Sequence, residues 1–153
     1  MLAALRNHFP NIKDVNIEMF GATPLLFAEI EGHKKKLPLN YLSGGLTKLA
    51  AMLAAIPNLQ GGIVLIDEIE NGFHFRKLPR LWDTLLHMCE AYDVQLFAST
   101  HSYECLKAAA ISASKTPDKF SLIQAVRTED GCDLKQFNGS QFNSAIDADV
   151  EIR

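Results

Sequence analysis

Two acidic residues, Asp67 and Glu68, directly follow a short apolar run, Ile63–Ile66, and His101 follows another such run at residues 94–98. Carboxylates in such a place can hold Mg²⁺, which retains several of its waters, or can orient and polarise an attacking water molecule. Each group alone has a simpler interpretation, because charge must leave the core where a strand ends and a histidine can serve as a cap. Their expected convergence from separate strands favours a catalytic site.

The elements between these residues predict how they meet. Both apolar runs lack polar alternation, which is typical of strands buried on both faces of a parallel sheet. A helix predicted over residues 77–92, with Pro79 in its first turn, joins them into a strand–helix–strand unit with parallel strands. Since ligands of open parallel sheets lie beyond the carboxyl ends of the strands, we expect Asp67 and His101 at the same edge.

A third group, Ser43, Gly44 and Gly45, opens a strong helix-forming run that ends at Pro57. Serine is a favoured N-cap residue, and we expect both glycines to be exposed to solvent in the first turn. The start of a helix can bind a phosphate through its free N–H groups. For these three residues alone, however, an ordinary N-cap is the simpler interpretation.

The remaining segments predict a small antiparallel sheet before this helix and a hairpin near the end of the chain. The strand-like segments are residues 15–20, 25–31 and 37–39 in the sheet, and residues 120–127 and 132–137 in the hairpin, which turns at residues 129–131. Further helices are predicted over residues 1–9, 103–112 and 140–146. We therefore expect one α/β domain spanning residues 1–153.

The composition suits a single globular domain of 153 residues, because 48% of them are apolar and 22% are charged. A net charge of −3 does not support nucleic acid as a partner. The one lysine run, residues 34–36, is either a solvated turn or a phosphate contact. Three cysteines without a C-x-x-C pair indicate free thiols in a reducing cytosol. With no apolar stretch of membrane length, we predict a cytoplasmic protein without membrane contact.

Taken together, three segments resemble the ABC-type ATPase superfamily. Residues 42–45 match the start of its signature motif, residues 63–68 match its Walker B strand, and residues 99–102 match its switch-histidine loop, in the family's order and spacing. Residues 67–74, Asp-Glu-Ile-Glu-Asn-Gly-Phe-His, resemble the soluble OLD-like and SMC/RecF-like ATPases more than transporter subunits. The resemblance covers nearly the whole chain, including its closing residues 151–153.

This resemblance implies a domain that uses ATP and Mg²⁺. Asp67 would hold the metal ion, Glu68 would polarise the attacking water, and His101 would contact the γ-phosphate and sense its presence. The implied fold is part of a P-loop NTPase domain of ABC type. It has a parallel sheet core with flanking helices, a small antiparallel N-terminal sheet and a C-terminal hairpin.

The signature residues imply a partner. Ser43, Gly44 and Gly45 would meet a phosphate of ATP bound on the opposite subunit, so we expect a homo-oligomer, a dimer in this family, with nucleotide between two copies. Two positions depart from the transporter pattern: Leu46 replaces Gln, and His74 replaces Asp. The soluble branch commonly has His at the second position, but both departures leave the details of the dimer contact open.

A P-loop is absent from the sequence. That motif needs G-x-x-x-x-G-K-[ST], whose N–H groups and lysine cradle the phosphates, yet none of the nine glycines is followed by lysine. We therefore expect the C-terminal part of an ATPase domain, completed by an N-terminal P-loop lobe or an intact homologue. Alone, the chain is expected neither to bind MgATP tightly nor to hydrolyse it, and to expose apolar residues where the lobe would pack.

Two functions remain consistent with these motifs. The chain is either the signature and catalytic half of an ATPase, or a non-enzymatic truncated module that dimerises with or regulates one. The complete set of Asp67, Glu68 and His101 favours the ATPase. A nuclease built on Asp67, Glu68 and Glu70 is disfavoured, because the Walker B context explains the same acids.

Overall fold

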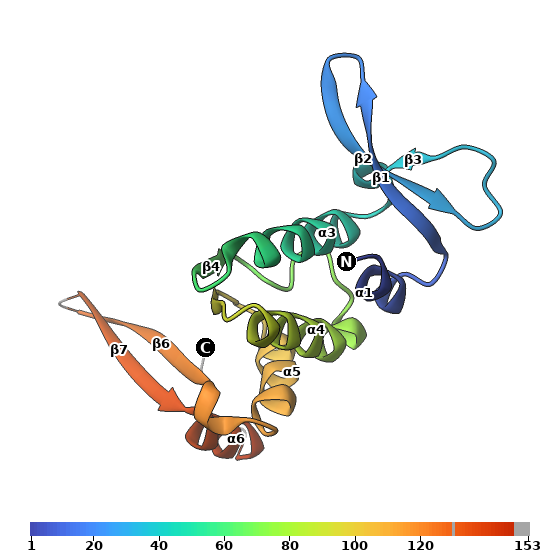
Figure 1. Ribbon diagram of the computed structural model, residues 1–153. Helices are drawn as coiled ribbons and strands as arrows, with labels where there is room; N and C mark the ends of the chain where they lie inside the picture. Colours follow the sequence, from blue (N-terminus) through green and yellow to red (C-terminus); the bar gives the residue numbers. More distant parts are fainter. Residues whose placement is uncertain (130, 149–153) are drawn as a thin grey trace.

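Figure 1 shows the computed structural model of the protein, which describes residues 1–129 and 131–148. Asp130 of the predicted hairpin turn and the closing residues 151–153 lie outside these ranges. Helices occupy the centre of the molecule, and one β-hairpin projects from each side of it (Figure 1). The predicted class is confirmed: a mixed α/β fold with a parallel strand pair, flanking helices, a small antiparallel N-terminal sheet and a C-terminal hairpin.

The central element is the pair of parallel strands that carries both predicted polar ends. β4 (Ile63–Ile66) runs beside β5 (Gln95–Ala98), with Ile63 opposite Gln95 and Ile66 opposite Ala98. α4 (Leu78–Ala91) connects the two strands. The predicted strand–helix–strand unit and the parallel pairing of its strands are therefore confirmed.

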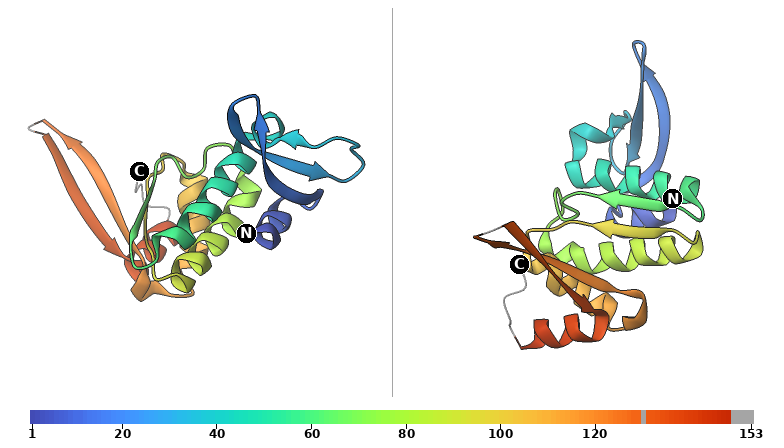
Figure 2. Two further views of the ribbon diagram at one scale, coloured as in Figure 1. Left: turned by 45° about the horizontal axis from the view of Figure 1, so that its top comes forward. Right: turned by 90° about the vertical axis from the view of Figure 1, so that its left-hand side faces the viewer.

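One hydrophobic core joins these strands to α3 (Gly44–Ala55), α4 and α5 (Tyr103–Ala113). Figure 2 shows the two strands side by side, and its left view shows α3 and α4 together on one side of them. α3 forms because most of its residues after the two opening glycines are Ala, Leu and Met, which are strong helix formers. α5 forms behind an N-cap serine, Ser102, whose Oγ accepts from the amide of Cys105. Short 3₁₀ turns complete this region: η1 (Ile56–Leu59), η2 (Phe75–Lys77) and η3 (Pro117–Lys119).

The N-terminal sheet is antiparallel, with the strand order β1-β2-β3. Its elements are α1 (Leu2–His8), β1 (Ile12–Phe20), β2 (Thr23–Ile30), β3 (Leu37–Pro38) and α2 (Leu39–Leu42). Lys36 of the predicted lysine run forms an exposed ion pair with Glu18 at 2.6 Å, in keeping with a solvated connection between strands. α2 was not expected from the sequence, because four residues are too few to establish a helical period.

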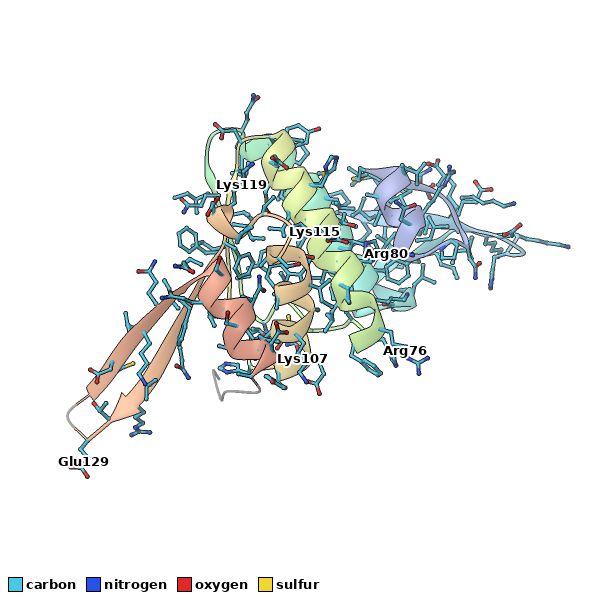
Figure 3. All side chains as sticks on the ribbon, turned by 90° about the horizontal axis from the view of Figure 1, so that it is seen from below. Arg76, Arg80, Lys107, Lys115, Lys119 and Glu129 are labelled. Atoms are coloured by element: carbon cyan, nitrogen blue, oxygen red, sulfur yellow. The ribbon has the colours of Figure 1, made fainter. Side chains whose placement is uncertain are left out.

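Cationic side chains attach α1 to the body. Lys77 Nζ donates to the carbonyl of His8 at 3.1 Å, and the Arg80 guanidinium, labelled in Figure 3, donates to the carbonyl of Asn7. Both carbonyls belong to the last turn of α1, where positive charge is favourable. The His8 ring is buried, 3.0 Å from Thr84 Oγ1. Burial, followed by the charges of Arg80 and Lys77, lowers the pKa of His8 below its ordinary value.

The C-terminal hairpin and the helix after it form as predicted. β6 (Ser121–Thr128) pairs antiparallel with β7 (Gly131–Asn138), and Glu129 lies at the tip (Figure 3). α6 (Gly139–Asp147) begins with a capping box between Asn138 and Gln141. Phe142 of α6 stacks on Phe120 with ring centroids 5.4 Å apart, which fixes the base of the hairpin to the core.

One face of the parallel pair is uncovered, and the prediction that both faces are buried is wrong. Val64 and Ile66 are buried, but Ile63, Leu65 and Phe97 are 54%, 76% and 43% exposed. The described residues supply helices to one face only, whereas the apolar sequence of the strands suits cover on both faces. We call Ile63, Leu65 and Phe97 the open sheet face.

Candidate functional site

Asp67 and the loop after β5 are joined at the carboxyl edge of the strand pair. Ser99 Oγ donates to Asp67 Oδ1 and accepts from the amide of Glu68 at 2.9 Å. The Ser99 amide donates to the carbonyl of Ile66 at 2.9 Å, which continues the parallel pairing one residue beyond the strands. The prediction that Asp67 and the histidine loop share one edge is therefore confirmed.

The backbone of Glu68 adopts an unusual conformation. Its φ is +46°, in the left-handed region that non-glycine residues rarely enter. Strained backbone of this kind persists only when its surroundings determine it, and it is concentrated at functional sites. Asn71 Nδ2 donates to Glu68 Oε2, and the Asn71 amide donates to the carbonyl of Glu68 at 2.9 Å. Both the side chain and the backbone of Glu68 thus have defined partners.

His101 reaches the site through its backbone. Its amide donates to Glu70 Oε1 at 3.2 Å, and its own side chain is exposed. Glu70 Oε2 is buried without a hydrogen-bond partner among the described residues. Glu70 therefore links the loop after β4 to the histidine loop. A cavity of about 390 Å³ opens beside this link, lined by Glu70, Asn71, Gly72, Phe73, Phe75, Leu78, Ser102 and Glu104.

The start of α3 has the predicted cap. Ser43 is the N-cap residue, and its Oγ accepts from the amide of Leu46 at 3.2 Å. Gly44 is exposed, as expected, but Gly45 is buried, so the expectation that both glycines are exposed is wrong. The reason is Gly72, which follows the acids with a φ of +85°: a Cβ added to Gly45 would lie 2.2 Å from its carbonyl oxygen.

Lys48 connects α3 to the two acids. Its Nζ donates to the carbonyl of Asp67 at 3.0 Å and to the carbonyl of Glu68 at 2.6 Å. The helix start and the acidic loop are therefore held together at two points: the backbone contact of Gly45 with Gly72, and this lysine.

The acids can accommodate Mg²⁺ chemically. Asp67 is exposed at the strand edge, and one of its oxygens carries the hydrogen bond from Ser99. Among the described residues no three His, Cys, Asp or Glu side chains are grouped to hold a metal ion by themselves. Mg²⁺ does not require such a group, because it is usually bound by one or two carboxylates, water and substrate phosphates. The residues present fit an ion that arrives with a nucleotide.

Sequence reasoning missed the contributions of Ser99, Lys48 and Gly72. Ser99 carried a usable signal, since it directly follows the strand that pairs with β4 and so must lie opposite Asp67. Lys48 and Gly72 carried none, because their contacts depend on how α3 packs against the loop after β4.

Residues 4–107 match the family described as "AAA domain, putative AbiEii toxin, Type IV TA system". The chain belongs to this family of AAA-type ATPases. An "ATP/GTP phosphatase" from Helicobacter pylori is 27% identical to this AAA domain over 104 residues. That alignment covers 66% of the chain and 28% of the relative, so the chain spans less than a third of that protein.

Two solved structures share the fold of this AAA domain. One comes from work on ATP-driven dimerization and DNA-stimulated activation of SMC ATPases; its TM-score is 0.58 and its identity 13%, covering 95% of this chain and 88% of that one. The other is an Smc head bound to the C-winged helix domain of ScpA. Its TM-score is 0.64 and its identity 13%, covering 89% of this chain and 40% of that one. None of the helices described in this AAA domain is long and apolar enough to cross a membrane.

Proposed function

We propose that residues 1–153 are the C-terminal portion of an ABC-type ATP-hydrolysing domain of the OLD-like or SMC/RecF-like branch. The observation that carries the proposal is the edge formed by Asp67, Glu68 and Ser99. There, two acids are bonded to the loop of His101, and one of them is held in strained backbone. Membership of an AAA-type ATPase family supports the same reaction.

Asp67, Glu68 and His101 would each have one task. Asp67 would hold Mg²⁺, directly or through water, and the ion would neutralise phosphate charge. Glu68 would accept a hydrogen bond from the attacking water and polarise it. Asn71 donates to Glu68 Oε2, and the other carboxylate oxygen of Glu68 can accept the hydrogen bond from water. The exposed imidazole of His101 would contact the γ-phosphate.

The start of α3 would serve a second nucleotide. Ser43 Oγ and the amide of Gly44 lie at an exposed helix N-terminus, which favours a phosphate group. We infer that Ser43, Gly44 and Gly45 act on ATP held by a partner subunit, and that Gly45 contributes by allowing the close approach of Gly72. A dimer would then contain two nucleotides, each contacted by the acids of one subunit and the helix start of the other.

Phosphate binding would require a P-loop from outside these 153 residues, either on an N-terminal lobe or on an intact homologue. The open sheet face supports such a partner. Leu65, its most exposed residue, is 76% exposed, although strands of parallel sheets are normally buried on both faces. An apolar surface of a P-loop lobe is the cover that these strands would need. Without it, we expect self-association through Ile63, Leu65 and Phe97.

The substitution Glu68→Gln tests the proposal in an assembly that joins the chain to the P-loop lobe of a relative. It keeps the shape of the side chain and removes the charge, so turnover should fall by about 10²–10⁴-fold while MgATP still binds. Glu129→Gln, at the tip of the hairpin, is the matched control and should leave turnover unchanged. Turnover of Glu68→Gln within a few-fold of wild type would remove Glu68 from this role.

Calorimetry on the chain alone tests the need for a P-loop. An exposed helix terminus contributes about 0.3–1 kcal/mol to anion binding, far below the roughly 8 kcal/mol of a micromolar complex. The carboxylates of Asp67 and Glu68 repel the phosphates of the nucleotide unless Mg²⁺ lies between the carboxylates and the phosphates. We expect no saturable MgATP binding near or below about 1 μM. Binding in that range would show that the chain carries a complete nucleotide site.

A non-enzymatic regulatory module is the alternative, and the same assembly distinguishes it, since a module would dimerise with an ATPase yet be indifferent to Glu68→Gln. Nucleic acid is not supported as a partner by the cations that lie near α4 (Figure 3). Lys115, which follows α5, pairs with Asp83 of α4 at 2.8 Å, and Lys119 of η3 pairs with Glu90 of α4 at 2.6 Å. Arg80 of α4 itself donates to a carbonyl of α1.

A further inference from the structure

Lys48 lies between the two halves of the candidate site. It belongs to α3, while the carbonyls that its ammonium binds belong to Asp67 and Glu68, after β4. An ammonium group has three donors and no acceptor, so these two carbonyls use most of its capacity. The ion pairs of the described residues involve three other lysines, Lys36, Lys115 and Lys119, so Lys48 is committed to backbone rather than to a carboxylate.

The contact falls on backbone that must be held in place. Glu68 has a φ of +46°, and such a conformation is maintained by its neighbours rather than by local preference. Ser99 Oγ binds the amide side of Glu68 at 2.9 Å, and Lys48 binds the carbonyl side at 2.6 Å. Together they fix both peptide planes of the residue, and therefore the direction in which its side chain leaves the backbone.

We propose that Lys48 is a positioning residue that orients the Glu68 carboxylate and ties it to the start of α3. The ammonium bonds to backbone carbonyls, so it acts on the carboxylate through the main chain. Lys48 stands five residues after the N-cap Ser43, about one and a half helical turns away. A shift of the helix start on phosphate binding therefore moves the carbonyls of both acids, and this coupling works equally in the reverse direction.

Hydrogen exchange on the 153-residue chain tests the positioning without any nucleotide. The amides of Glu68, Ile69, Asn71 and Phe73 are all hydrogen-bonded and should be protected. In Lys48→Met they should exchange about tenfold faster, the size expected for loss of an accessible charge-assisted hydrogen bond. The amides of β5 and α4 should be unaffected. Lys48→Arg, which keeps charge and donors, should restore most of the protection.

Lys35→Met is the control, because it removes one exposed lysine from the β2–β3 connection and should change nothing near Glu68. Unchanged exchange at these amides in Lys48→Met would overturn the proposal. Faster exchange throughout α3, α4 and β5 would overturn it as well, because Lys48 would then be a general stability residue.

The catalytic consequence rests on the proposed ATPase function and needs the assembly with a P-loop lobe. There, Lys48→Met should lower kcat by about tenfold or more and leave the KM for MgATP within about threefold, with recovery in Lys48→Arg. A raised KM with unchanged kcat would make Lys48 a nucleotide ligand instead, which overturns the positioning role. A wild-type assembly without turnover would refute the proposed function, while the exchange result would still decide the positioning.

Discussion

Two adjacent glycines of α3 should respond to the same substitution in opposite directions. A Cβ added to Gly44 meets no atom within 4 Å, whereas one added to Gly45 lies 2.2 Å from the carbonyl oxygen of Gly72. Gly44→Ala should stabilise the protein by about 0.4–1 kcal/mol, because alanine has less freedom to lose on folding. Gly45→Ala has the same entropic advantage, but its methyl group must push two backbone segments apart, which gives a net cost in stability of about 1–3 kcal/mol.

Urea unfolding followed by circular dichroism measures the difference, which should be about 1.5–4 kcal/mol between the two variants. For a domain of this size each kcal/mol moves the melting temperature by about 2–4 °C, so thermal scans provide a second measurement. Several protein concentrations are needed, since the open sheet face can make unfolding depend on association. If Gly45→Ala were as stable as Gly44→Ala, then α3 would not contact the loop after the acids, and the site geometry described above would be incorrect.

Three further outcomes are expected. Leu65→Ser should reduce self-association in sedimentation, whereas Leu134→Ser, at a similarly exposed leucine of the hairpin, should not; equal effects would mean that the open sheet face has no special role. The free energy of unfolding should fall as the pH drops below about 6.5, the unfolded pKa of histidine, because the folded pKa of His8 lies lower and the unfolded chain takes up the proton first. A flat profile between pH 7.5 and 5.5, or one unchanged in His8→Gln, would contradict this. Ser43→Ala should cost about 1 kcal/mol of stability yet abolish turnover in the P-loop assembly; unchanged turnover would leave Ser43 as a cap only.

The arrangement around the acids was predictable because it depends on local signals. Three local signals are enough to specify a parallel pair with a shared polar edge: four apolar residues followed by Asp67-Glu68, a helix of suitable length, and a second apolar run followed by Ser99. The N-cap at Ser43 was predictable for the same reason, since a cap depends on a few neighbouring residues.

Tertiary packing determined what was not predictable. The exposure of Leu65 depends on which elements cover β4. An apolar sequence indicates that a strand can be buried, but it does not show which of its faces this chain covers. The burial of Gly45 follows from the path of the chain at Gly72, 27 positions later by their numbering. In the sequence, nothing distinguishes Lys48 from any other lysine of a helix, because its two carbonyl partners are brought to it only by the packing of α3.

The two glycines at the start of α3 have different structural roles, which the sequence alone does not distinguish. Gly44 faces open space and leaves the helix start accessible to a ligand, while Gly45 lets the backbone of Gly72 approach to within contact. That contact is between main chains, so it has no side-chain torsions with which to absorb movement. Lys48 adds a second, more adjustable connection a turn further along. A group bound at the start of α3 therefore contacts a rigid unit that also includes Asp67 and Glu68. In the proposed dimer, each nucleotide would be linked through α3 to the catalytic acids that serve the other nucleotide.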